Sequence, residues 1–307
     1  MTKYPIHKEL KLIGKVKFPH KPSILSVANA LLRLTYRKKD SKVDVKKVKL
    51  PGYQGELINV YIIEPKDVEK TMPCIFDLHG GGFMLAASPM HFNRAKEYAA
   101  KLSCKVIFPD YRLAPKYKCP TALEDCFSIY QWLLENAEEL KIDTDHIAVL
   151  GDSAGGNLAI GVSLLARDQS VKMPCYQMLI YPATDRRLNT ESMKKYVDTP
   201  VWDARLSKQM WEFYLEGNET EYIKYISPME EVSFQGMPPA YVEVAEFDAI
   251  RDEGLLYAER LKKEGIIVEV HEVKGAPHGY DSIHTSNMVK AHMARRIELL
   301  KDVLEKN

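Results

Sequence analysis

Short apolar, β-rich runs alternate with longer helical patterns along most of this chain. The runs are Cys74–Leu78, Lys105–Phe108, Ile147–Leu150, Tyr176–Tyr181, Ala240–Ala245 and Val268–Val273. Apolar residues recur at three- and four-residue steps over Ala122–Leu140, Ala154–Ala166, Asp252–Lys263 and Asn287–Leu304. Strands joined through helices form right-handed crossovers, so this order predicts an α/β fold, a mostly parallel sheet with helices on both faces.

Three segments depart from the alternation. Residues 43–49 and 56–63 alternate in polarity on either side of Pro51-Gly52, which predicts an antiparallel strand pair. Residues 1–42 come before this pair and include an amphipathic pattern over Ile24–Arg37. Residues 184–235 are too long for a simple connection and rich in aromatic residues, so they are expected to carry their own helices. We favour a lid over the strand ends, where ligands bind in such sheets, and helices packed on the side remain the alternative.

Composition excludes several classes of protein. The 307 residues include 43 basic and 42 acidic side chains, a net charge of +1 that suggests no nucleic acid partner. Hydrophobic residues make up 46%, enough for a sizeable core. No apolar run approaches the roughly 18 residues of a membrane span, and the N-terminus has no signal-peptide core. We expect a soluble, cytoplasmic protein.

Five scattered cysteines form no CxxC pair and are expected to be reduced thiols. The nine histidines show neither HExxH nor a zinc-type spacing with cysteine. We therefore expect no metal and no cofactor.

A nucleophile motif follows the run Ile147–Leu150. Residues 151–155 read GDSAG and lead directly into a helical pattern, the strand–turn–helix context in which G-x-S-x-G exposes a serine hydroxyl. A β-carbon at Gly151 or Gly155 is expected to collide with the crossing strand or helix. The alternative is a phosphate-binding loop, but the segment lacks both the P-loop lysine and G-x-G-x-x-G. Ser153 is the candidate nucleophile.

A glycine-rich loop follows the run Cys74–Leu78. Residues 79–83 read HGGGF, which allows bare backbone N–H groups to approach a substrate oxygen. We expect the N–H groups of Gly81, Gly82 and Ala154 to form an oxyanion hole.

The acid and the base come later in the chain. Asp248 follows the run Ala240–Ala245, and His278 lies in a glycine-flanked loop after Val268–Val273. The order Ser153, Asp248, His278 is that of α/β-hydrolases. Asp252 competes with Asp248 but precedes a helical pattern, where a helix cap is the better interpretation.

Two further charged residues lie near the expected site: Arg112 follows the run Lys105–Phe108, and Asp152 directly precedes Ser153. Arg112 is expected to be structural, donating to backbone carbonyls or to Asp110. Asp152, beside the nucleophile, either orients loops or is simply solvated.

Taken together, the motifs resemble the hormone-sensitive lipase family of α/β-hydrolase carboxylesterases. They are HGGGF (79–83), DYRLAP (110–115), GDSAGG (151–156), DxxRDEG (248–254) and HGY (278–280). The resemblance implies one α/β-hydrolase domain over residues 1–307, with a helical cap from about 1–42 and about 184–235. It also implies a Ser153–Asp248–His278 triad. Lys116, Ala249 and Tyr280 depart from the usual pattern, and none of them removes a catalytic group.

The expected function is a serine carboxylesterase that hydrolyses short-chain, acetyl-type esters of small molecules through an acyl-enzyme. Phe83, Met84 and the aromatic residues of 184–235 either wall off a small acyl pocket or pack the cap. A deacetylase or amidase of small acylated compounds remains an alternative, and a non-catalytic receptor a weaker one. The exposed last strand, Ile267–Val273, could pair with a second copy in a homodimer.

Overall fold

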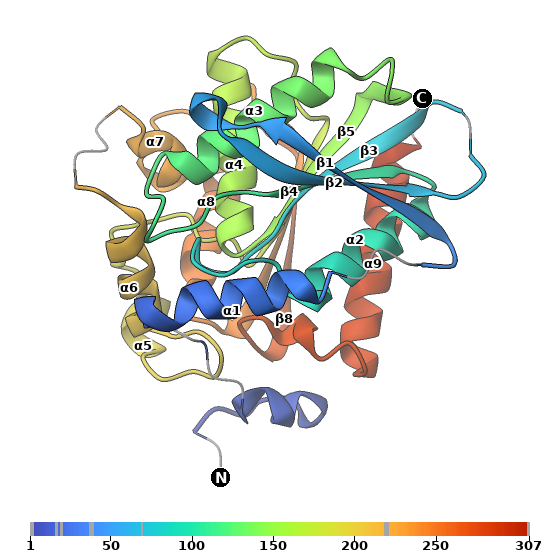
Figure 1. The fold of residues 1–307 in the computed structure, drawn as a ribbon. Helices are drawn as coiled ribbons and strands as arrows, with labels where there is room; N and C mark the ends of the chain where they lie inside the picture. The colour runs from blue at the N-terminus through green and yellow to red at the C-terminus, as the bar shows by residue number, and fades with distance from the viewer. Residues whose placement is uncertain are drawn as a thin grey trace.

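The computed structural model describes residues 3–15, 18, 21–36, 40–68, 70–217 and 221–305. In these ranges one eight-stranded sheet runs in the order β1-β2-β4-β3-β5-β6-β7-β8 (Figure 1). The strands are β1 (Val43–Pro51), β2 (Leu57–Pro65), β3 (Met72–Leu78), β4 (Lys105–Asp110), β5 (Ile142–Asp152), β6 (Tyr176–Ile180), β7 (Ala240–Phe247) and β8 (Val268–Pro277).

The sheet is mostly parallel, as the sequence predicts. The hairpin β1–β2 is antiparallel from Val43 opposite Pro65 to Pro51 opposite Leu57, and β2 pairs antiparallel with β4. Every other neighbouring pair from β4 to β8 is parallel. The carboxyl ends of β5, β7 and β8 therefore lie at one edge of the sheet.

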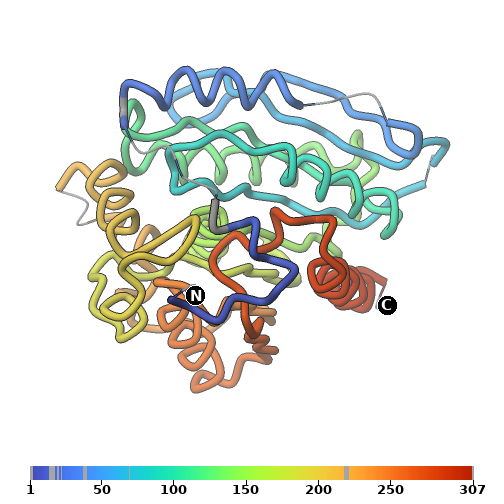
Figure 2. Tube along the Cα trace, turned by 90° about the horizontal axis from the view of Figure 1, so that it is seen from below, coloured from blue at the N-terminus to red at the C-terminus, as the bar shows by residue number. Residues whose placement is uncertain are grey.

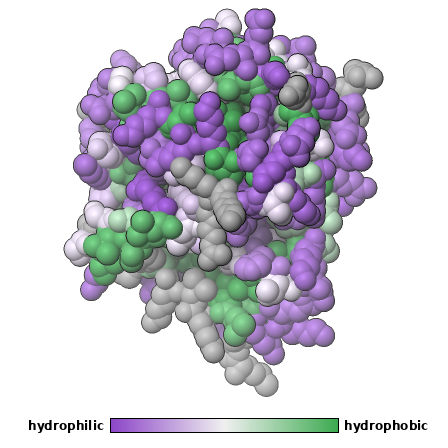
Figure 3. All heavy atoms as spheres, turned by 45° about the vertical axis from the view of Figure 1, so that its right-hand side comes forward, coloured by the Kyte–Doolittle hydropathy of each residue, from purple (hydrophilic) through white to green (hydrophobic). Residues whose placement is uncertain are grey.

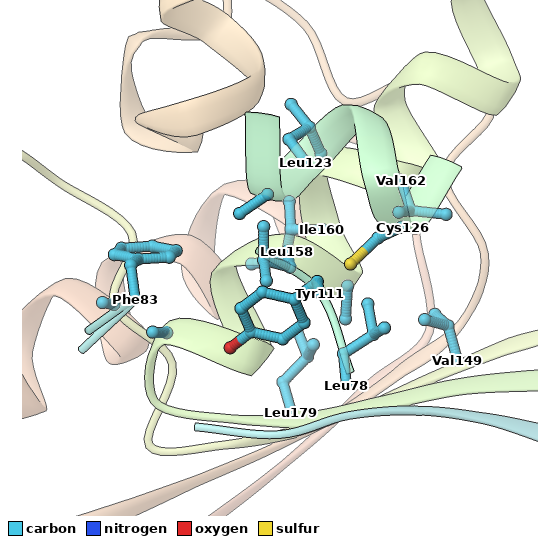
Figure 4. Close-up of a cluster of buried hydrophobic side chains, with 14 of the residues drawn as sticks. Leu78, Phe83, Tyr111, Leu123, Cys126, Val149, Leu158, Ile160, Val162 and Leu179 are labelled. Carbon is cyan, nitrogen blue, oxygen red and sulfur yellow. The ribbon is translucent and has the colours of Figure 1, made fainter. Parts of the chain in front are cut away.

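Helices cover both faces. On one face α3 (Thr121–Glu135), α4 (Ala154–Asp168) and α8 (Arg251–Lys263) bury a core against the strands. Figure 4 shows part of it, with Leu78, Val149 and Leu179 of the sheet below side chains of α3 and α4. On the other face α2 (Pro89–Leu102) and α9 (Asn287–Leu304) enclose a second core.

The sequence patterns missed α2 and misjudged several ends. A signal for α2 was present, because Ser88 and Pro89 form a good helix start and apolar residues follow at Phe92, Ala95 and Ala99. The pattern Ala122–Leu140 stops being helical at Glu135, and β5 begins five residues before its apolar run. β8 continues through the supposed loop to Pro277, so His278 follows the strand directly.

The N-terminal segment and the insertion between β6 and β7 lie outside the sheet. The first contains a 3₁₀ helix, η1 (Lys8–Lys15), and α1 (Pro22–Leu34), while Arg37 lies outside the described residues. The insertion contains α5 (Glu191–Lys195), α6 (Ala204–Tyr214), α7 (Ile223–Ile226) and η3 (Pro228–Glu230). Two short 3₁₀ turns, η2 (Tyr53–Gly55) and η4 (Tyr280–Ser282), complete the described helices.

Residues 3–15 lie beside the C-terminal part of the sheet (Figure 2). The N–H of His7 donates to the carbonyl of Gly275 at 2.9 Å, and Glu9 accepts from the hydroxyl of Ser286 at 2.7 Å. The ring of Tyr4 meets that of Tyr196 in the insertion at 5.7 Å. The two extra segments are therefore joined to each other and to the strand ends.

No helix in the described ranges is both long and apolar enough to cross a membrane.

Candidate active site

Ser153 occupies a sharp turn between β5 and α4. Its backbone lies at φ 54°, ψ −119°, a strained conformation for a residue with a side chain. Its N–H donates to the carbonyl of Ile180 at 2.9 Å, and its own carbonyl accepts from the N–H of Ala183 at 3.1 Å. Neighbouring strand β6 thus helps to hold the turn that presents the hydroxyl.

The glycines around this turn are required because neighbouring backbone atoms leave no room for a β-carbon. A β-carbon on Gly155 would overlap the carbonyl of Leu78 in β3, and one on Gly151 would overlap the carbonyl of Gly155. The predicted collisions at both positions are therefore confirmed.

Three polar side chains form a hydrogen-bonded chain at the strand ends. Nε2 of His278 lies 3.0 Å from Oγ of Ser153, and its Nδ1 lies 2.6 Å from Oδ2 of Asp248. A carboxylate only accepts, so Nδ1 carries the proton and Nε2 is left to accept from the serine hydroxyl. All three residues are at most 5% exposed. The structure brings together the residues that the sequence order selected.

Two aromatic rings flank the imidazole of His278. The ring of Tyr181, just after β6, lies 4.6 Å from it, and the ring of Trp202, in the insertion, lies 5.8 Å away. The hydroxyl of Tyr181 donates to Asp281 at 2.5 Å, which fixes this ring in place. The sequence placed Trp202 only within the aromatic insertion and Tyr181 only at the end of a strand run, because both are remote from the motifs in the chain.

The glycine-rich loop lies across β5 and α4. Gly81 and Gly82 have φ of 128° and 61°, conformations that favour glycine. A β-carbon on Gly82 would lie 2.6 Å from the ring of Trp202. Among the described residues, the N–H groups of Gly81, Gly82 and Ala154 donate to no protein acceptor. These three donors remain available to a ligand.

His79 and Tyr111 stabilise this loop through contacts with its first two carbonyl groups. Their rings stack at 4.3 Å, and the Tyr111 hydroxyl donates to the carbonyl of His79 at 2.6 Å. Nδ1 of His79 lies 2.7 Å from the carbonyl of Gly80. Burial lowers the pKa of His79 to about 4, so this imidazole is neutral at neutral pH. The DYRLAP run was the available signal for Tyr111.

Asp152 is buried in an ionic cluster and is not solvated. Its Oδ1 accepts from Arg94 at 2.9 Å, and its Oδ2 accepts from Nε2 of His91 at 3.0 Å. Arg94 also donates to Asp77 at 2.9 Å. Burial alone would raise the pKa of Asp152, but His91 and Arg94 outweigh it and hold this pKa below its usual range. The cluster, which we call the elbow cluster, joins α2 to the ends of β3 and β5.

The predicted ion pair between Arg112 and Asp110 is wrong. Arg112 donates to the carbonyl of Tyr53 as expected, but its carboxylate partner is Asp125, at 2.7 Å, and not Asp110. Asp110 is bound by Arg33 of α1 instead.

Asp252 does not cap its own helix, which begins one residue earlier. It accepts from the N–H of Ser192 at 2.7 Å, in the first turn of α5.

Phe83 and Met84 are fully buried. Phe83 stacks on Tyr214 of α6 at 3.9 Å with an interplanar angle of 7°, and its ring and that of Tyr111 are seen in Figure 4. These contacts belong to packing between the loop and the insertion, and the acyl-pocket interpretation of both residues stays a prediction.

The five cysteines are free thiols, four of them buried. No group of three histidine, cysteine or acidic side chains in the described part of the chain is arranged to hold a metal ion.

The chain is similar to known α/β hydrolases and esterases. The family model for the α/β hydrolase fold matches residues 75–282. Carboxylesterase NlhH of Mycobacterium tuberculosis is 34% identical over 234 residues, 75% of this chain and 73% of that protein. A putative α/β hydrolase of Acanthamoeba polyphaga mimivirus is 33% identical over 225 residues, 73% of this chain, and the match spans 65% of its length.

Among solved structures, a bacterial heroin esterase superimposes with a TM-score of 0.91 at 30% identity, covering 99% of this chain and 100% of that one. With the family match and the esterase relatives, this places the chain in the hormone-sensitive lipase-like family of α/β-hydrolases, as a carboxylic ester hydrolase.

Proposed function

We propose that Ser153, His278 and Asp248 are the catalytic triad of a two-step ester hydrolysis. The observation that carries the proposal is the continuous hydrogen-bonded chain, 3.0 Å and then 2.6 Å, that ends on a serine in a strained turn. Burial of all three side chains keeps water away from the chain and strengthens its electrostatic interactions.

The steps follow from the donors and acceptors. Nε2 of His278 takes the proton of the Ser153 hydroxyl as Oγ attacks the ester carbonyl, and the imidazolium then protonates the leaving alcohol. In the second step Nε2 of His278 takes a proton from water as the water oxygen attacks the acyl carbonyl. The imidazolium then returns this proton to Oγ of Ser153 as the bond between Oγ and the acyl carbon breaks and the acid is released. Asp248 holds the proton on Nδ1 and stabilises the imidazolium. These steps require no cofactor.

The oxyanion of each tetrahedral intermediate is assigned to the N–H groups of Gly81, Gly82 and Ala154. Support comes from their lack of a protein acceptor among the described residues, and from two of them having backbone angles typical of glycine. Each such donor contributes about 3–4 kcal/mol to transition-state stabilisation.

We propose short acyl chains, such as acetyl, as the preferred acyl group. The ring of Trp202 lies near both His278 and Gly82, so it limits the space on that side of the reacting serine. Residues of about 1–42 and 184–235 act as the cap. This assignment is supported by the edge-to-face contact of Phe18 with Trp202 at 5.0 Å and by the ion pair of Lys3 with Asp198.

Hydrolysis of p-nitrophenyl esters from acetate to dodecanoate by the wild type and Ser153→Ala tests the proposal. We expect turnover highest for short chains and almost abolished in the variant, with an unchanged melting temperature. Substantial turnover by the variant would refute the nucleophile assignment. An anilide series separates esterase from amidase, and ligand binding without turnover would indicate a receptor.

Homodimerisation through β8 remains a proposal. This strand is the last of the sheet, and Val268–Glu272 are only partly covered, so its free edge could pair with a second copy. Sedimentation of the protein at several concentrations tests this.

A further inference from the structure

Helix α1 has an apolar outer face. Ile24, Val27, Leu31 and Leu34 follow one another at three- and four-residue steps and are 48%, 61%, 59% and 82% exposed. We call these four residues the α1 stripe. The opposite side of the helix is already packed against the protein, since Leu25 and Asn29 are buried there. A surface helix normally exposes polar side chains to water. A contiguous apolar outer face such as this one is typical of a helix that contacts a partner protein or a membrane.

The inner side of α1 is firmly attached, so the α1 stripe is held in position. Asn29 donates to the carbonyl of Met84 and accepts from the N–H of Ala86, both at 2.9 Å. Arg33 forms a bidentate ion pair with Asp110. A groove of about 650 Å³ separates α1 from the start of β2, where Leu57 is 62% exposed. Leu57 therefore adds an exposed apolar side chain next to the helix.

The overall charge of +1 conceals a strong asymmetry along the chain. Of the 43 basic and 42 acidic residues, the first 50 positions hold 14 and 3, which leaves 29 and 39 in the rest. The first 50 residues thus carry +11 and the remaining 257 carry −10. Such an asymmetry indicates an anionic partner for the basic segment.

Several of these basic residues are exposed close to α1 in the chain. Lys21 is exposed at the start of α1, and Lys42, Lys46, Lys47 and Lys49 are exposed on or beside β1. Helix α1 and the β1–β2 pair both lie at the front in Figure 1 and along the top in Figure 2. The surface in Figure 3 is mostly hydrophilic, with hydrophobic residues in separate patches. Lys47 lies 5.6 Å from the centre of the Tyr61 ring, and that ring packs edge-to-face against Tyr36, two residues after the end of α1. A basic side chain of β1 is therefore linked by packing to the C-terminal end of the helix that carries the α1 stripe.

We propose that this side of the protein docks on an anionic phospholipid bilayer, with the α1 stripe in the acyl boundary and the lysines at the headgroups. Apolar side chains on a helix with nearby lysines are the pattern of interfacial helices. Each basic residue near an anionic surface adds about fivefold to the affinity. A second copy of the chain fits less well, because a two-fold contact through α1 would bring two strongly basic segments together.

Sedimentation with sucrose-loaded vesicles tests the proposal. At low salt we expect binding to phosphatidylcholine vesicles containing about 30% phosphatidylserine, and little binding to phosphatidylcholine alone. Leu31→Ser/Leu34→Ser lowers the partition coefficient about tenfold or more, since two long side chains leave the acyl boundary. Lys47→Gln/Lys49→Gln removes two exposed charges from one face of β1. It lowers binding to the anionic vesicles only, and added salt has the same effect.

The matched control is Val232→Ser/Leu256→Ser, which removes two side chains that are 90% and 40% exposed elsewhere on the surface. It is expected to bind vesicles as the wild type does, and all variants should melt within a few degrees of the wild type. The proposal is overturned if the wild type ignores anionic vesicles, or if the α1 variant binds as well as the control. It is also overturned if the wild type is a dimer that Leu31→Ser/Leu34→Ser dissociates, because a second copy then covers the α1 stripe.

Discussion

Replacing Asp152 by Asn removes a buried negative charge from the elbow cluster while keeping the size of the side chain. The carboxylate is 5% exposed and accepts one hydrogen bond from Arg94 and one from His91, whose side chains are 3% and 9% exposed. The amide retains one acceptor oxygen, so one of the two donors faces an NH₂ group.

The loss of unfolding free energy depends on the hydrogen-bond acceptors that Arg94 keeps in the variant. Removing one partner of a buried ion pair costs about 3–5 kcal/mol in unfolding free energy. Asp77 still accepts from Arg94 at 2.9 Å, so the lower end, about 3 kcal/mol, is expected. With an unfolding entropy of about 2.1 cal/mol/K for each of 307 residues, that corresponds to a fall in Tm of roughly 5 °C.

The contribution of Asp152 depends on pH in a known direction. Its pKa is lower in the folded protein than in the unfolded chain, so the stabilisation is complete above about pH 4 and is lost as the pH falls below that value. The Tm difference between the wild type and Asp152→Asn should therefore be constant near neutrality and shrink in acid.

Thermal and urea unfolding from pH 3 to pH 8 measure this difference. Asp145→Asn is the matched control, because the side chain of Asp145 is 78% exposed and its ion pair with Lys172 is worth about 0–1 kcal/mol. If Asp152→Asn is no less stable than Asp145→Asn at pH 7, the elbow cluster does not stabilise the fold through this charge.

Three further substitutions test other contacts. Arg112→Ala leaves Asp125 buried without its cation and should cost about 3 kcal/mol in stability while kcat changes little; an unaltered Tm would count against this. Burial raises the pKa of Glu253 well above its usual range, so its stability contribution is complete below about pH 4.3 and falls by about 1.4 kcal/mol per pH unit above it. Glu253→Gln should therefore raise Tm at pH 8 more than at pH 4, and an equal Tm difference at both would contradict the assignment. Trp202→Ala should increase the rate for octanoate relative to acetate, measured as a kcat/KM ratio, and an unchanged ratio would show that this ring does not limit the acyl group.

Much of the fold could be predicted because its signals are local. Strand and helix periodicities are visible within single segments, and their alternation leaves few topologies. Helix α2 was missed although Ser88-Pro89 marked its start, and β8 was ended too early because Gly275 and Pro277 are typical of a loop. Such residues are tolerated there because, among the strands in the described ranges, β8 pairs with β7 alone.

In the candidate site, too, local features could be predicted from the sequence and contacts between remote elements could not. The sharp turn at Ser153 requires glycines beside it, and these are visible in the sequence. The order of Ser153, Asp248 and His278 along the chain is visible as well. The sequence by itself therefore determined the fold class and the three candidate residues. Only the tertiary structure decided that Arg112 pairs with Asp125, that Asp152 is enclosed by Arg94 and His91, and that Trp202 reaches His278. The physical reason is that a charged or aromatic side chain has several acceptable partners along the chain, and the packing of remote elements selects the one it meets.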